Sequence, residues 1–449
     1  MKNKQTDLVN GNIFKGVFLL GVPLMLSNIL QVLFNMSDIA VVGRFAGSNA
    51  LGSVGSTSIH VMLFTGLVIG VGGGINVAAA QAMGTGDCET VKARIQNCAA
   101  VALFAGVFIC LLSLFASPPL LRLLDTKPEL LSGAETYMRI YSFGFPALMI
   151  YNFGNAVLSA AGNTKKPLII LLASGIINVA LNVFFVTVIG MDVDGVAYAS
   201  IISQYLSAAA VTAVLLKTDK NYRLSLKNFK LQKTQVFSVL SLGVPAALQN
   251  AIFACANFFI LAGVNRLDTL MVKGNSAAAN ADNLIYDIMA AFYTAGTSFI
   301  GQNFGARKRE RIKKSYFAAL FYSFTAAVIG GVLLLVFGRQ FLSLFTSEAD
   351  VITAGMQRLK IMAFSYAVSA FMDCTIAASR GIGKTLVPTA IVIAGSCVFR
   401  IIWVYTIFDY FKTVPSLYLL YVFSWAITAI AEIIYFKHAF KKQTAGFEE

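Results

Sequence analysis

The segment GVFLLGVPLMLSNILQVLFNMSDIAVVG, residues 16–43, is long and apolar enough to cross a lipid bilayer, yet it carries a set of polar side chains. A membrane-spanning helix needs about 20 mostly apolar residues. The polar set is Ser27, Asn28, Gln31, Asn35 and Asp38. At about 100° per residue, these positions occupy roughly a third of the helix circumference. They therefore predict a polar stripe that faces protein or water and not lipid.

Asp38 is the costliest member of this stripe. A carboxylate at the centre of a bilayer costs about 2.5 kcal/mol or more, and acids inside membranes usually mark an ion, proton or substrate path. The alternative is a carboxylate that only fixes the helix to its neighbours; we favour the functional interpretation. Pro23 lies fifteen positions earlier and removes a backbone hydrogen bond, so a bend is expected there.

The composition indicates a polytopic membrane protein. Of 449 residues, 57% are hydrophobic and 12% charged, whereas soluble domains average about 25% charged residues. The net charge of +14 lies mostly in short connectors and not on a polar domain, which argues against a nucleic-acid partner. The N-terminal segment lacks the pattern of a cleaved signal peptide, so the first helix is expected to remain as an anchor.

Apolar runs of about 20 residues predict an all-α fold with twelve transmembrane helices. The runs centre near residues 28, 66, 105, 147, 179, 205, 249, 290, 326, 366, 399 and 426. Those near 66 and 290 are the more polar. Alternate connectors, beginning with the N-terminus, hold more than twice as many lysines and arginines as the others. This bias predicts that both termini lie in the cytoplasm.

The two halves of the chain are repeats. LeuGlyValPro at 20–23 recurs at 242–245, and at nearly the same displacement Gln81-x-x-Gly84 recurs as Gln302-x-x-Gly305. Six helices per half give parallel repeats, which place the substrate path between the halves and predict alternating access by rocking. The predicted parts are an N-lobe of residues 1–216, a cytoplasmic linker of residues 217–234 and a C-lobe of residues 235–449.

The repeat also exposes an asymmetry, because Asp38 corresponds to Ile260. Only the first half carries a carboxylate at this position. We infer that the N-lobe holds the ion-coupled group.

Several motifs in a fixed order resemble the multidrug and toxic compound extrusion (MATE) transporters of the MOP superfamily, specifically their DinF-like bacterial branch. The motifs are 35–45 (NMSDIAVVGRF), 81–86 (QAMGTG), 161–167 (AGNTKKP), 301–306 (GQNFGA) and 379–385 (SRGIGKT). The resemblance covers nearly the whole chain. It implies an antiporter in the plasma membrane that exports cationic or amphipathic compounds in exchange for H⁺ or Na⁺. We expect a monomer with no cofactor other than the coupling ion.

The resemblance also implies the members of an N-lobe cavity. These are Asp38, Gln31, Asn152, Asn155, Asn178, Asn182 and Ser200, with Pro23 as the helix bend. One position departs from the family pattern: Leu-Asn-Val at 181–183 stands where Leu-Asp-Pro is common. The amide of Asn182 cannot release a proton, so Asp38 would act alone or with an acid of the C-lobe. A Na⁺ site near Asp38, Asn178 and Asn182 stays open.

The C-lobe offers its own candidates. Asp287 and Asp373 are predicted to line the path or bind cations. Arg400 lies inside an apolar run, so it must form an ion pair or extend its side chain to the interface. We favour a structural salt bridge, with Asp373 as the candidate partner. Glu432, close to the basic C-terminal tail, is expected near the membrane interface.

Two alternatives to an exporter of cations remain. A flippase for a lipid-linked sugar or cell-wall precursor would need several cationic residues on the path, and only Arg400 is assigned to a membrane segment. An enzyme is not expected. The P-loop-like residues 378–385 begin with Ala in place of Gly and follow no strand, and His60 and His438 form no metal motif.

Overall fold

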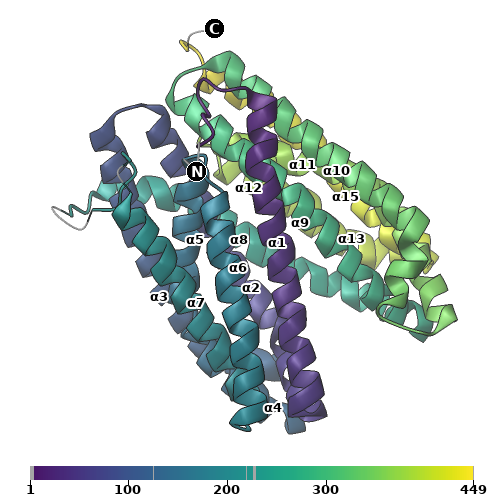
Figure 1. Ribbon diagram of the computed structural model, residues 1–449. Coiled ribbons are helices and arrows are strands. Elements are labelled where there is room, and N and C mark those ends of the chain that lie inside the picture. Colours follow the sequence, from purple (N-terminus) through teal and green to yellow (C-terminus); the bar gives the residue numbers. More distant parts are fainter. Residues whose placement is uncertain (1–4, 125, 219, 226–228, 448–449) are drawn as a thin grey trace. The chain divides into compact units, whose positions relative to one another are not determined.

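The computed structural model describes residues 5–124, 126–218, 220–225 and 229–447, which are almost entirely helical (Figure 1). Residues 219 and 226–228 of the predicted linker lie outside the described residues. The α-helices are α1 (Ile13–Val41), α2 (Ser48–Gly84), α3 (Cys88–Leu123), α4 (Pro128–Ser142), α5 (Phe145–Ala160), α6 (Lys165–Val183), α7 (Val193–Lys217), α8 (Lys233–Val264), α9 (Thr269–Gly305), α10 (Arg309–Ser343), α11 (Ala349–Gly381), α12 (Leu386–Val392), α13 (Phe399–Trp403), α14 (Asp409–Phe411) and α15 (Val414–Gln443). Short π-helical segments are η1 (Val42–Ala46), η2 (Phe184–Val188), η3 (Ile393–Val398) and η4 (Val404–Phe408).

Ten helical spans of the described chain are long and apolar enough to cross a membrane. Two of the twelve predicted segments are not among them. The segment near residue 147 is divided at Phe143 and Gly144 into the shorter helices α4 and α5, and the segment near 290 is the polar helix α9. The large side chains on the outside are often apolar, such as Phe115 of α3, which is 78% exposed. The all-helical polytopic membrane fold is as predicted.

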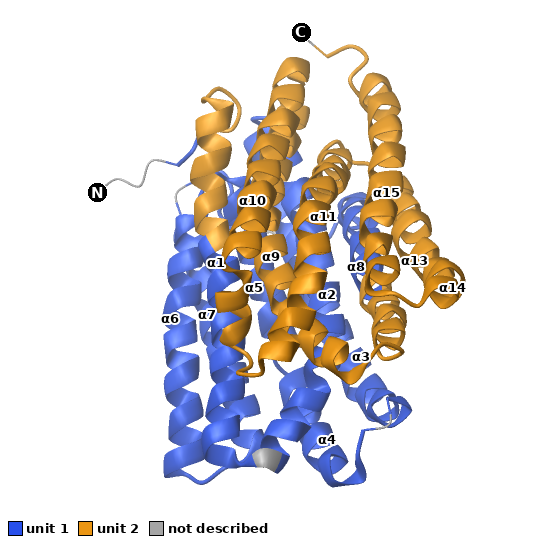
Figure 2. Cartoon of the chain, turned by 90° about the vertical axis from the view of Figure 1, so that its right-hand side faces the viewer, with its two compact units in different colours: residues 1–6, 26–251 blue, residues 7–25, 252–449 orange. Residues whose placement is uncertain are grey.

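The helices group into two compact units, coloured in Figure 2. Unit 1 comprises residues 1–6 and 26–251, and unit 2 comprises residues 7–25 and 252–449. The boundaries fall inside α1 and α8, close to Pro23 and Pro245. These units are defined by packing, whereas the predicted lobes are defined by the sequence repeat, so the two divisions differ.

In unit 1, the first half of α8 packs on α2 through small residues. A Cβ atom on Gly70 would lie 2.3 Å from the Cα of Ala247, and one on Gly74 would lie 2.4 Å from the Cα of Gly243. Only glycine permits this backbone contact, which is a common way for membrane helices to associate. The contact explains why residues 233–251 belong to unit 1.

In unit 2, the chain before α1 is fixed to the turn between α9 and α10. The Leu8 side chain is 2% exposed. Its backbone carbonyl accepts hydrogen bonds from Asn303 Nδ2 at 3.0 Å and from Arg311 Nη2 at 3.2 Å. Further along, Gly21 allows the ring of Phe292 to approach α1. These contacts explain why residues 7–25 group with the C-terminal half of the chain.

The repeat is visible in the backbone of the two halves. Gly162 and Gly383 both have left-handed φ angles, 79° and 81°, and they occupy nearly equivalent positions of the repeat. Gly190 (78°) and Lys412 (51°) form a second pair, with the same displacement as the two LeuGlyValPro motifs. The turn after α5 and the turn after α11 therefore have the same form, although the second pair replaces glycine with lysine.

We predict opposite effects from exchanging residue types at the second pair. Gly190→Ala should lower the free energy of unfolding by about 1 kcal/mol, because an L-residue is strained at positive φ and an added Cβ meets nothing within 4 Å. Lys412→Gly should raise the free energy of unfolding, because glycine adopts a positive φ without strain. The increase should be smaller than the loss in Gly190→Ala, because glycine also makes the unfolded chain more flexible. Thermal unfolding in detergent measures both, and shifts of the same sign in the two variants would contradict the prediction.

Candidate functional site

The C-terminal part of α1 and the C-terminal end of α6 carry a group of polar side chains that lie close together in unit 1. Asn182 Nδ2 donates a hydrogen bond to Asp38 Oδ1 at 2.5 Å and lies 3.5 Å from Asn178 Oδ1. Asn182 is completely buried, Asn178 is 6% exposed and Asp38 is half-buried. The structure thus brings together three of the residues that the sequence suggested.

Close packing between α1 and α6 places these groups. A Cβ atom on Gly175 would lie 1.9 Å from Cε2 of Phe34, so the absence of a side chain at Gly175 makes room for the ring. Asp38 follows Phe34 by one helical turn, and Asn178 follows Gly175 by about one turn. The face of α1 that packs on α6 therefore continues into the face that carries Asp38. In the same way, the packed face of α6 continues into the face that carries Asn178.

Both helices change geometry directly after the site. α1 continues into η1 and α6 into η2, and these two π-helical segments contact each other. Segments of π-helix within longer helices are frequent at functional sites. This local geometry had no signal in the sequence analysis.

Two tyrosines of α4 belong to the surroundings of Asp38. Tyr137 and Tyr141 lie close enough to interact with its charge, and their rings stack with centroids 5.5 Å apart. Gln204 Nε2 of α7 donates to the Tyr141 hydroxyl at 3.3 Å. Neither tyrosine is among the residues predicted from the sequence, although their spacing of four in a predicted helix places both rings on one face.

The other predicted residues of the N-terminal half make local contacts. Asn152 Nδ2 donates to the carbonyl of Leu148 at 2.9 Å, and Asn155 Oδ1 accepts from Ser159 Oγ at 3.4 Å. Ser200 is buried in α7, and Gln31 is exposed on α1, two turns before Asp38. Their role in a cavity stays a prediction.

Asp373 and Arg400 are both buried in unit 2, at 8% and 2% exposure. Tyr286 donates its hydroxyl hydrogen to Asp373 Oδ1 at 3.4 Å. The expected salt bridge between Asp373 and Arg400 is absent from the ion pairs of the described residues. Instead, Arg400 Nε donates to Ser424 at 3.0 Å. Its guanidinium lies over three aromatic rings, those of Phe253, Tyr421 and Trp425. A planar, weakly hydrated guanidinium is suited to such stacking, which explains why the prediction was wrong.

A buried ion pair in unit 2 was missed. Arg358 is 4% exposed inside α11 and forms a salt bridge with Asp282 of α9, which also accepts a hydrogen bond from Tyr366. The prediction that Arg400 is the one arginine of the membrane segments is wrong, because Arg358 lies within the apolar span of residues 349–381. The reason is that α11 begins at Ala349, earlier than the apolar run suggested.

Two further predicted acids lie in unit 2. Asp287 is half-buried on α9. Glu432 is completely buried on α15, three turns before that helix ends at Gln443. Its place near the membrane interface stays a prediction.

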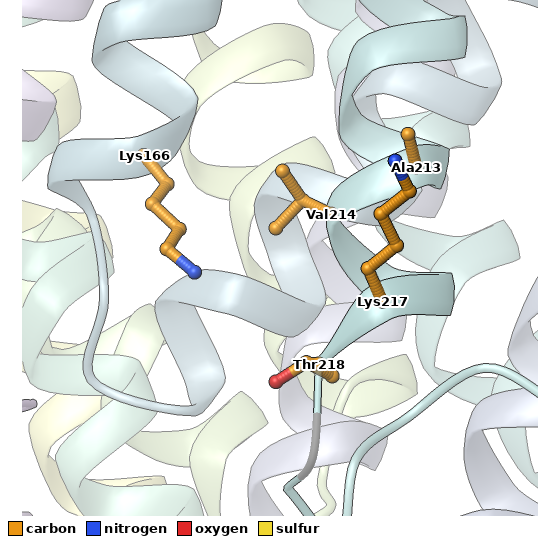
Figure 3. Close-up of a pocket in the computed structure, with 5 residues that line it drawn as sticks. All are labelled: Lys166, Ala213, Val214, Lys217 and Thr218. Atoms are coloured by element: carbon orange, nitrogen blue, oxygen red, sulfur yellow. The ribbon is translucent and has the colours of Figure 1, made fainter.

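The pocket in Figure 3 belongs to a different part of unit 1. Its lining residues are Lys166, Ala213, Val214, Lys217 and Thr218, from the start of α6 and the end of α7. Asn182 follows Lys166 by sixteen residues, which is roughly 24 Å along a helix. This pocket is therefore separate from the polar group around Asp38.

Comparison with known proteins identifies relatives along most of the chain. A model of the MatE family matches residues 23–184 and again residues 245–406. The two matches have equal length, and one lies in each half of the chain. The chain is 30% identical to "Probable multidrug resistance protein YpnP" of Bacillus subtilis, over 81% of each protein. It is 26% identical to the "FAD transporter" of Shewanella oneidensis, over 71% of each.

A solved structure shows the same fold. It is described as the outward-facing conformation of a multidrug resistance MATE family transporter of the MOP superfamily, and it matches with a TM-score of 0.90 at 23% identity. The match covers 99% of both chains.

We predict that the contact between Gly175 and Phe34 controls the polar group. Gly175→Ala should lower the free energy of unfolding by about 1–3 kcal/mol, because the added methyl group overpacks the contact. Phe34→Ala in the same chain should restore much of the loss, since it removes the ring that the methyl group meets. Thermal unfolding of the two single variants and the double variant measures this coupling. Additive losses in the double variant would show that the contact is not the cause.

Proposed function

The chain belongs to the MatE family of multidrug efflux transporters, and on that premise we propose that it is an ion-coupled antiporter that exports cationic or amphipathic organic compounds. The coupling ion is H⁺ or Na⁺, and it binds at Asp38. The observation that supports this most directly is the hydrogen bond between Asp38 and the buried Asn182.

The geometry is suited to competition between an ion and a cationic substrate. Protonation of Asp38 removes the charge that would attract a cation, whereas the ionised form attracts one and accepts a hydrogen bond from Asn182. If the ion and the substrate each disfavour binding of the other, the coupling is reciprocal and drives exchange. Parallel repeats then allow alternating access, and Pro23 lets α1 bend as Asp38 is loaded.

Na⁺ has a specific argument in its favour. Asn182 Oδ1 is buried and accepts no hydrogen bond within the described chain. In the structure the amide nitrogen of Asn182 faces Asp38 and Asn178. Rotation of this amide by half a turn would direct its oxygen to the same side as theirs and give a hard cation the carboxylate and carbonyl ligands that such ions prefer. A proton needs Asp38 alone, so the two ions remain to be distinguished by measurement.

An anionic cargo, such as that of a lipid flippase, is the second candidate. One of the relatives is named as an FAD transporter, and Arg358 and Arg400 are buried cations in unit 2. However, Arg358 is neutralised by Asp282 and Arg400 is stacked among aromatic rings. We therefore favour cationic cargo. We further propose that both termini are cytoplasmic and that a single chain transports.

Asp38→Asn should reduce gradient-driven transport at least tenfold, because an amide can neither bind a proton nor hold a cation by charge. The measurement is uptake of a fluorescent organic cation into proteoliposomes under an imposed pH gradient or an imposed Na⁺ gradient. Glu129→Gln, at an exposed acid of α4, is the matched control and should transport normally. Transport by Asp38→Asn at the control rate would refute the mechanism, and the gradient that drives the control identifies the ion.

A further inference from the structure

Glu432 is an unusual acid in the described chain. Its side chain lies on α15 and is 0% exposed. Both of its carboxylate oxygens are buried without a hydrogen-bond partner among the described residues. The sequence motifs and the proposed function leave this residue without a role.

The charged and titratable surroundings of Glu432 are few. From α11, which packs along α15, the charge of Arg380 interacts with it, but Glu432 is absent from the ion pairs of the described residues within 4.0 Å. From its own helix, Tyr435 interacts with it. From α13, Arg400 reaches α15 at Ser424, two turns earlier.

Arg380 connects Glu432 to the other polar groups of unit 2. Its charge also interacts with Asp373 of α11 and with Tyr286 and Tyr293 of α9. Arg380 thus lies within electrostatic reach of two acids, and a movement of its side chain changes the balance between them.

This environment fits a neutral carboxylic acid. A buried carboxylate without hydrogen bonds loses its hydration, and no protein contact replaces the lost interactions with water. This costs several kcal/mol. A salt bridge with Arg380 would supply the missing contacts, but it requires the guanidinium to approach. The two arrangements differ by one proton: the acid is uncharged while the groups are apart, and it is ionised when they pair.

We propose that Glu432 is a second proton-binding site, located in unit 2 and separate from Asp38. It holds one proton in the conformation described here and releases that proton to water when Arg380 moves to salt-bridge distance. The O–H bond of the carboxyl group breaks, both electrons stay on the oxygen, and the new carboxylate pairs with the guanidinium. Its use in transport rests on the proposed antiport, whereas proton binding itself does not.

Infrared difference spectroscopy of the full-length protein in lipid nanodiscs tests this site, because a protonated carboxyl group has its own C=O stretching band. We expect Glu432→Gln to remove one such band that is present in the wild type at neutral pH. Asp38→Asn and Glu129→Gln should both keep it. An unchanged spectrum for Glu432→Gln at every pH measured would overturn the proposal.

Two further measurements separate a proton site from a purely structural acid. Glutamine resembles the protonated acid, so Glu432→Gln should unfold at the wild-type temperature at neutral pH, whereas loss of an existing ion pair would lower that temperature clearly. Arg380→Gln should keep the Glu432 band to higher pH, because the cation that favours the ionised form is gone. A band that titrates identically with and without Arg380 would also overturn the proposal. Loss of transport in Asp38→Asn with the Glu432 band intact would show that the two sites are independent.

Discussion

Inside a bilayer there is no water to satisfy a buried polar group, so each ionisable side chain must find its partner within the protein or lose its charge. The protein meets this constraint in three different ways. Asp38 accepts a hydrogen bond from the buried amide of Asn182. Asp282 pairs with Arg358. Glu432 has no such partner among the described residues, and this difference led us to assign it a proton.

Contacts between helices at glycine allow these partners to meet. Gly175 leaves room for the ring of Phe34, so α1 and α6 approach closely enough for Asn182 to reach Asp38. In α2, Gly70 and Gly74 permit backbone contact with α8. Because apolar side chains gain little by moving from lipid to a helix interface, such close packing has a larger share in stabilising this fold than it would in a soluble protein.

The two halves share left-handed turns at corresponding positions but differ in charge. Left-handed turns recur at Gly162 and Gly383, and even where lysine replaces glycine at position 412 the conformation is retained. At the position of Asp38, by contrast, the second half has Ile260, which is 4% exposed in an apolar core. The repeat therefore preserves the conformation of these turns, while the ionisable groups are distributed differently in each half.

The sequence by itself determined the membrane class, the helical architecture and the internal repeat, because hydropathy and motif spacing are properties of local segments. It also singled out Asp38, since a carboxylate within an apolar run is conspicuous. Only the tertiary structure decided which groups are partners. It showed that Arg400 stacks on aromatic rings instead of pairing with Asp373, that Arg358 is buried beside Asp282, and that Glu432 is enclosed. Partners in a helical bundle come from segments far apart in the chain, and their meeting depends on how each helix is rotated and how closely it packs. A hydropathy pattern does not specify either quantity.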